Sequence, residues 1–280
     1  MTAHPLPSMH LSRADRDRQL SPSLSAKDAA GVLARHSART SALWSDPDFD
    51  CTRDLSYGAA PRQLLDVVRP LGPGPFPCLI FLHGGFWQEG DKGGSGFAAR
   101  RLGHAGWASA LVGYSLAPDA RLSEIVTEVG QAIDYLADNA GELRLDPKRF
   151  ILAGHSAGGH LAAALICGKA GQRTAETIAG AVLISGVYDL EPIAMSYVNE
   201  AVGLDADDVR ALSVLDENPI SDIPIHLLIG EDEPAAFQEQ TDALAAAWSN
   251  SISALSLHRE PGCDHFNILD ELASLMEKTQ

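Results

Sequence analysis

Ser156 could act as a nucleophile because of the residues on either side of it. It lies in the stretch GHSAG at residues 154–158, which matches G-x-S-x-G, directly after the apolar run 150–153 and before the alanine-rich stretch 157–170. A strand, a sharp turn and a helix in this order expose a serine hydroxyl at the edge of a sheet, and the flanking glycines keep Cβ atoms out of the turn. The pattern therefore predicts that Ser156 attacks a substrate covalently.

A second glycine motif, HGGFW at residues 83–87, follows the apolar run 78–82. Glycines allow the backbone N–H groups of a loop to approach a ligand closely. With a serine nucleophile downstream, we expect the N–H of Gly84 or Gly85, together with that of Ala157, to bind the oxyanion of a tetrahedral intermediate.

The proton acceptor for such a serine should be a histidine, because an imidazole can take the proton and return it to a leaving group near neutral pH. Where a G-x-S-x-G turn is used, the base follows the serine and the acid along the chain. Near the C-terminus this leaves His258 and His265. His258 lies within the strand-like run 252–258, whereas His265 lies in a loop before the last helix, where open α/β sheets carry their sites. The position favours His265.

The acid is expected after the apolar run 225–229, where residues 231–233 are three consecutive carboxylates. The acid commonly stands three residues after the glycine that ends such a strand, here Gly230, and this selects Glu233. Asp232 remains an alternative, because a carboxylate one position away leaves the turn on another side.

Short apolar runs must form the strands that position these residues. Six are present, at 64–68, 78–82, 108–112, 150–153, 181–184 and 225–229. The last five are almost continuously apolar, as parallel strands covered on both faces are. Helical patterns at 123–139, 157–170 and 237–248 alternate with them. The sequence therefore predicts an α/β fold with a mostly parallel central sheet and helices on both faces.

Two segments depart from this alternation. Residues 1–50 are predicted to be an N-terminal extension to a single domain at 51–280, with a loose arm up to about residue 25 and a short amphipathic helix at 26–40. Residues 188–219 lack a clear period and should form short helices over the sheet. They are either a cap over a pocket or a surface excursion.

The charge balance narrows the class of partner. The 280 residues include 37 acidic and 21 basic side chains, a formal charge of −16, which disfavours nucleic acid and anionic membrane surfaces. The longest apolar run is too short for a membrane span and the N-terminus lacks the apolar core of a signal peptide, so we expect a soluble cytoplasmic protein. The four cysteines are far apart without a CxxC pair, which indicates reduced thiols.

Metal and phosphate motifs are missing from the sequence. It contains neither HExxH nor the order G-x-x-x-x-G-K-[ST], and the glycine-rich stretch 90–96 indicates an active-site loop or a surface turn. We therefore expect no metal, no other cofactor and a small-molecule substrate as the partner. The sequence leaves a homodimer open.

Together, the motifs resemble those of the arylformamidase (kynurenine formamidase) branch of the serine α/β-hydrolases. HGGFW is similar to the HGGYW of that branch, with Phe86 in place of tyrosine, and residues 154–161 are similar to its elbow GHSAGGHL. Further similar blocks lie at 185–190, 233–237 and 264–266. The resemblance runs from about Asp50 to the C-terminus and implies the α/β-hydrolase fold.

The resemblance also bears on the site and the reaction. Members with glutamate in the acid position favour Glu233 over Asp232. The resemblance implies hydrolysis of an N-acylated aromatic amine, such as N-formylkynurenine or an N-acylanthranilate, through an acyl-enzyme. A carboxylesterase and a non-catalytic binding protein on the same scaffold are the alternatives. Four motif residues are candidate substrate contacts: Phe86, Trp87, His160 and Phe266.

Core packing is the other interpretation of two of these residues, Phe86 and Trp87, because large apolar side chains at a strand end are often buried.

Overall fold

An eight-stranded sheet forms the centre of the structure, a computed structural model that describes residues 6–279. Its strand order is β1-β2-β4-β3-β5-β6-β7-β8, with every pair from β4 to β8 parallel and with β1 and β2 antiparallel to their neighbours. The strands are β1 (Phe49–Ser56), β2 (Leu64–Pro70), β3 (Phe76–Leu82), β4 (Ala108–Val112), β5 (Leu145–His155), β6 (Gly180–Ile184), β7 (Ile225–Gly230) and β8 (Leu255–Glu260).

The apolar runs of the sequence explain the central strands. The five nearly continuous runs form β3 to β7, which are all parallel, and this confirms the predicted fold class. In β3, Leu79 and Phe81 contribute to one hydrophobic cluster and Ile80 and Leu82 to another, because alternate side chains of a strand leave on opposite faces. β1 was not predicted, since this half-exposed edge strand, FDCTRDLS, carries no apolar run.

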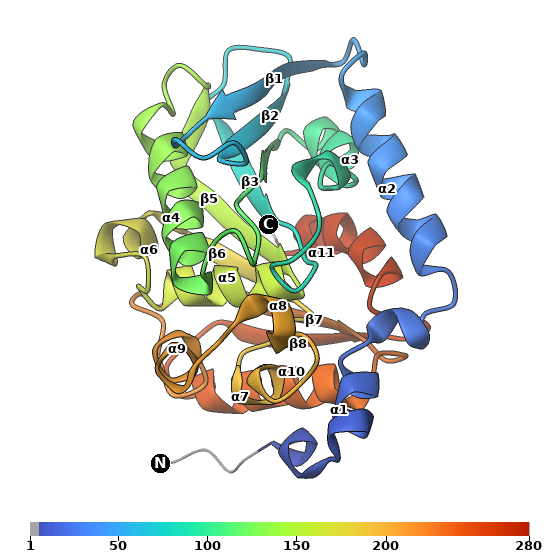
Figure 1. The fold of residues 1–280 in the computed structure, drawn as a ribbon. Coiled ribbons are helices and arrows are strands. Elements are labelled where there is room, and N and C mark those ends of the chain that lie inside the picture. The colour runs from blue at the N-terminus through green and yellow to red at the C-terminus, as the bar shows by residue number, and fades with distance from the viewer. Residues whose placement is uncertain (1–5, 280) are drawn as a thin grey trace.

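Helices cover both faces of the sheet (Figure 1). One face carries α4, α5 and α10, and the other carries α3 and α11, each with its own hydrophobic cluster. In the described part of the chain, none of the helices is long and apolar enough to cross a membrane. The helices around the sheet are α3 (Ala99–His104), α4 (Leu122–Asp138), α5 (Ala157–Ile166), α6 (Gln172–Thr177), α10 (Ala235–Trp248) and α11 (Leu272–Lys278).

The N-terminal segment is more ordered than the sequence suggested. Its first five residues lie outside the described part, but residues 6–25 form α1 (Arg13–Gln19) and two short 3₁₀ helices instead of a loose arm. The reason is Arg16, which is buried and whose guanidinium donates to the carbonyls of Ser8, Met9 and Leu11 and to that of Met195. Arg16 thus links the turns of the segment to one another and to the main domain.

The predicted amphipathic helix is α2 (Ala29–Leu43), which begins at the Asp28 N-cap. In Figure 1 it runs along one side of the molecule, beside α3 and α11. The irregular segment 188–219 forms α7 (Glu191–Ala194), α8 (Asn199–Val202) and α9 (Ala206–Leu212), short helices as predicted.

A buried ion pair fixes the loop that follows the HGGFW motif. The ammonium of Lys92 lies 2.7 Å from both carboxylate oxygens of Asp66, a fully buried residue of β2, and 2.8 Å from Oδ1 of Asp54. Burial alone would lower the pKa of Lys92, but its hydrogen bonds to these carboxylates outweigh it and raise that pKa. The loop is therefore anchored to the sheet by the ion pair between Lys92 and Asp66, whose carboxylate is buried from water.

Replacing Lys92 by methionine should lower the free energy of unfolding by about 3 kcal/mol, because the Asp66 carboxylate is left buried and unpaired. The double variant Lys92→Met, Asp66→Leu should lose less, since no buried charge is left without a partner and Asp54 is exposed to water. Urea unfolding measures both. The control Lys148→Met, at an exposed position, should stay within about 0.5 kcal/mol of the wild type. Equal losses in the single and double variants would contradict the assignment.

Candidate active site

Ser156 stands at a sharp turn between β5 and α5. Its backbone has φ 55° and ψ −118°, a conformation that costs a non-glycine residue on the order of 1–3 kcal/mol. The flanking glycines are required, since a Cβ on Gly154 would lie 2.0 Å from the carbonyl oxygen of Gly158, and one on Gly158 would lie 2.1 Å from that of Leu82. The turn is closed by a hydrogen bond from the N–H of Ser156 to the carbonyl of Ile184.

His265 and Glu233 form a buried hydrogen-bonded pair, with Nδ1 of His265 2.6 Å from Oε2 of Glu233. The other carboxylate oxygen accepts hydrogen bonds from the Ser185 hydroxyl at 2.5 Å and from the Gly230 N–H at 2.9 Å. The carbonyl of His265 accepts from Nε2 of His155 at 2.8 Å. The position of the imidazole is thus fixed through both its ring and its backbone.

Asp232, the alternative acid, points elsewhere. Its side chain is 43% exposed and accepts a hydrogen bond from the ammonium of Lys27 at 2.9 Å. Of the two candidate carboxylates, the structure brings Glu233 to His265 and places Asp232 in a surface ion pair.

Asp264, the neighbour of His265, shapes the loop that carries this histidine. Its carboxylate accepts hydrogen bonds from the backbone N–H groups of Phe266, Asn267 and Lys27. Burial alone would raise the pKa of Asp264, but these N–H groups outweigh it and lower that pKa. The carboxylate therefore stays ionised and holds His265 in its loop.

The HGGFW motif passes directly against the serine turn. A Cβ on Gly84 would lie 3.0 Å from both the carbonyl oxygen of His155 and the Cβ of Ser156. Within residues 6–279, the N–H groups of Gly84, Gly85 and Ala157 donate to no protein acceptor. Ala157 is also the first residue of α5, whose amino end carries a partial positive charge. Among the described residues, these N–H groups are therefore without a protein acceptor beside Ser156.

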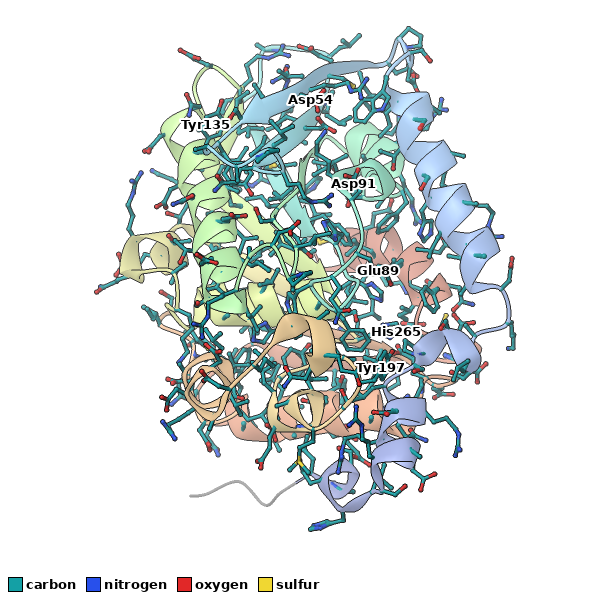
Figure 2. All side chains as sticks on the ribbon, viewed as in Figure 1. Asp54, Glu89, Asp91, Tyr135, Tyr197 and His265 are labelled. Atoms are coloured by element: carbon teal, nitrogen blue, oxygen red, sulfur yellow. The ribbon has the colours of Figure 1, made fainter. Side chains whose placement is uncertain are left out.

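A cavity of about 560 Å³ opens at this point. Ser156, His265, Gly84, Gly85, Phe86 and Phe266 all lie in its wall. Figure 2 labels four wall residues, His265, Tyr197, Glu89 and Asp91, which come from three separate segments of the chain. The cavity therefore gathers most of the residues that the sequence singled out.

Two predicted substrate contacts lie in the core instead. Trp87 and His160 are fully buried and pack edge to face, with ring centroids 5.1 Å apart. Nε2 of His160 donates to the carbonyl of Leu212 at 2.9 Å. Trp87 is part of the main hydrophobic cluster, and its carbonyl accepts from the N–H of Ala117. Phe86 and Phe266 remain as cavity residues.

Sequence reasoning missed several groups at the site. Ser185, which donates to Glu233, follows the strand β6 that lies next to β5, so the rule that sites gather at the carboxyl ends of parallel strands could have found it. The N-terminal segment carried no such signal. It supplies six wall residues: Ser21, Pro22, Ser23, Leu33, His36 and Ser37.

The N-terminal segment is attached to the turns that hold the His265–Glu233 pair. Lys27 donates through its N–H to Asp264, next to His265, and through its ammonium to Asp232, next to Glu233. The segment is therefore part of the site's framework.

The buried state of His160 has a measurable consequence. Burial lowers its pKa to about 4, whereas an unfolded histidine titrates near 6.5. Between these values the unfolded chain binds a proton that the folded one does not. This contribution to stability is complete above about pH 6.5 and falls by up to about 1.4 kcal/mol for each unit of lower pH.

Urea unfolding of the wild type and of His160→Gln between pH 6.5 and 4.5 tests this placement. The wild type should lose stability as the pH falls, to which His83 also contributes because burial lowers its pKa to about 4 as well. In the variant, unfolding should take up about one proton fewer, so the free energy of unfolding should fall less steeply with pH, by about 1.4 kcal/mol per unit. Parallel curves would show that His160 is accessible to protons in the folded state.

Comparisons with known proteins identify the family of this chain. Residues 65–226 match the model of the BD-FAE family. The chain is 33% identical to the kynurenine formamidase of Danio rerio, over 78% of this chain and 76% of the relative, and 28% identical to that of Drosophila melanogaster over the same shares.

Solved structures give the same fold. A protein of Silicibacter sp. TM1040 solved as a candidate thioesterase superposes with a TM-score of 0.81 at 30% identity, covering 92% of this chain and 94% of the other. A Pyrobaculum calidifontis esterase has a TM-score of 0.70 at 20% identity, covering 98% of both chains, and supports the fold alone. The chain therefore belongs to the kynurenine formamidase family of the α/β-hydrolases.

Proposed function

We propose that the protein is a serine hydrolase that cleaves N-acylated aromatic amines through an acyl-enzyme. One observation carries this proposal. The buried hydrogen bond between His265 and Glu233 lies at the cavity that Ser156 also lines, next to backbone N–H groups without a protein acceptor. Nucleophile, base, orienting acid and oxyanion donors are the four parts that acyl transfer requires.

In the first half of the reaction, the Ser156 hydroxyl attacks the carbonyl carbon while Nε2 of His265 takes its proton. Glu233 accepts from Nδ1, which keeps the ring in the tautomer that presents Nε2 as an acceptor and stabilises the imidazolium. The oxyanion is held by the N–H of Ala157 and one or both of Gly84 and Gly85. Each such donor contributes about 3 kcal/mol to the transition state.

The bond to the amine then breaks, and His265 gives the proton to the departing nitrogen. An aryl amine leaves more readily than an alkyl amine because its lone pair delocalises into the ring. Water enters, His265 takes its proton, and attack on the ester of Ser156 releases the acid and restores the hydroxyl.

The aromatic amine is supported by two kinds of observation. Phe86 and Phe266 lie in the cavity wall, where they can contact an aryl ring, and the cavity volume of about 560 Å³ suits a ligand of this size. The relatives named kynurenine formamidase hydrolyse, by their names, an N-formyl aryl amide.

A carboxylesterase is the second candidate, because esterases are among the sequence relatives that match half or less of this chain. The same residues would act on an ester, and the difference lies in the leaving group. A non-catalytic binding protein is disfavoured by the intact Ser156, His265 and Glu233.

The catalytic assignment predicts a contrast between neighbouring carboxylates. Ser156→Ala and Glu233→Gln should each lower kcat by at least about 10³-fold on an aryl ester, the first through loss of the nucleophile and the second through loss of the ring's orientation. Asp232→Asn is the matched control and should stay within about threefold of the wild type. Steady-state kinetics on 4-nitrophenyl acetate measures all three. A large loss in Asp232→Asn with little in Glu233→Gln would reverse the assignment, and turnover retained by Ser156→Ala would remove the nucleophile.

The choice between amide and ester predicts a second contrast. To correct for intrinsic reactivity, the kcat/KM of each substrate is divided by the rate constant of its hydrolysis by hydroxide. On this scale, an aryl amidase should hydrolyse formanilide at least as well as phenyl formate. Hydrolysis of the ester alone would make the protein a carboxylesterase.

A further inference from the structure

The cavity wall is short of positive charge. Among the described residues, it contains no lysine and no arginine, whereas two carboxylates, Glu89 and Asp91, lie on the loop after the HGGFW motif. Arg62 is 3.9 Å from Asp91, but Glu89 has no ion-pair partner within residues 6–279. A carboxylate on a substrate would therefore meet no partner of opposite charge in this wall.

The cations on neighbouring segments are already paired. Lys27 binds Asp232, Arg39 binds Asp270, and Lys92 is enclosed by Asp54 and Asp66. Each would have to give up a carboxylate of the protein to take one from a substrate. The cost of breaking such a pair reduces any gain.

Three of the histidines in the wall add no positive charge at neutral pH. Burial lowers the pKa of His83 to about 4 and that of His155 well below its usual range. Burial also lowers the pKa of His36, against the opposing effect of Asp270.

The part of the wall contributed by the N-terminal segment is neutral. It consists of serine hydroxyls, Pro22, His36 and Leu33, whose side chain is 49% exposed. Leu33 lies on α2, so the segment presents an apolar group at the open side of the cavity.

We propose that this site takes acyl substrates whose leaving group carries no net charge, and that the N-terminal wall at Leu33 contributes to this selection. The inference rests on the proposed function and separates its substrates by the net charge of the leaving group. An N-formyl aryl amide of zero net charge fits, whereas an N-acylanthranilate, with a carboxylate beside the amide, is selected against. The protein's charge of −16 acts in the same direction over longer range.

The test uses two isosteric esters, 4-acetoxybenzamide and 4-acetoxybenzoate, with each kcat/KM divided by the rate with hydroxide. The wild type should prefer the neutral ester by at least about tenfold. Leu33→Lys, which adds a cation to the wall, should narrow this preference by at least about threefold. Leu24→Lys is the matched control, because Leu24 is 73% exposed, close in sequence and outside the wall, and it should leave the preference within about twofold.

Equal rates on the two esters in the wild type would overturn the inference. Equal narrowing by both lysine variants would also overturn it, because the effect would then come from net charge and not from the wall. If the wild type cleaves neither ester, the proposed function fails. Calorimetric binding of 4-hydroxybenzamide and 4-hydroxybenzoate, compared across the same three proteins, then decides the charge preference without turnover, with equal affinities contradicting it.

Discussion

The close approach of α5 to β3 is the constraint on which the site depends. The backbone of Gly158 lies so near the carbonyls of Leu82 and His83 that no Cβ fits between them. This contact forces the chain to turn within one residue after β5, and Ser156 takes the strained conformation that results. The same contact brings the amino end of α5 beside the HGGFW motif. The positions of the serine and of the proposed oxyanion donors thus follow from one packing requirement.

Parallel pairing supplies the rest of the framework. β5, β6 and β7 are consecutive neighbours in the sheet, so their carboxyl ends present Ser156, Ser185 and Glu233 along one edge. His265 reaches the same edge from the loop after β8. The apolar runs and the glycines at their ends carry this information, which is why the fold class and most of the candidate site could be predicted from the sequence.

Other features depend on contacts between distant residues and had no local signal. The spacing after Gly230 favoured Glu233 over Asp232, but it gave no sign of the ion pair that occupies Asp232, whose partner Lys27 lies more than two hundred residues away in sequence. Trp87 and His160 belong to the sequence motifs, yet both are buried and pack against each other. The order of the N-terminal segment rests on Arg16, whose partners include Met195. The composition of the segment predicted a loose arm, because hydrogen bonds between residues far apart in sequence leave no trace in composition.

The central claim is that Ser156, His265 and Glu233 act as one unit. Its most direct test is to treat the folded protein with a fluorophosphonate and to map the adduct by peptide mass spectrometry, with His265→Gln treated in parallel. We expect a single adduct, on Ser156, that forms at least about 100-fold more slowly in the variant, because the serine then lacks its base. An adduct on a different serine, no adduct, or an equal rate in the variant would contradict the claim.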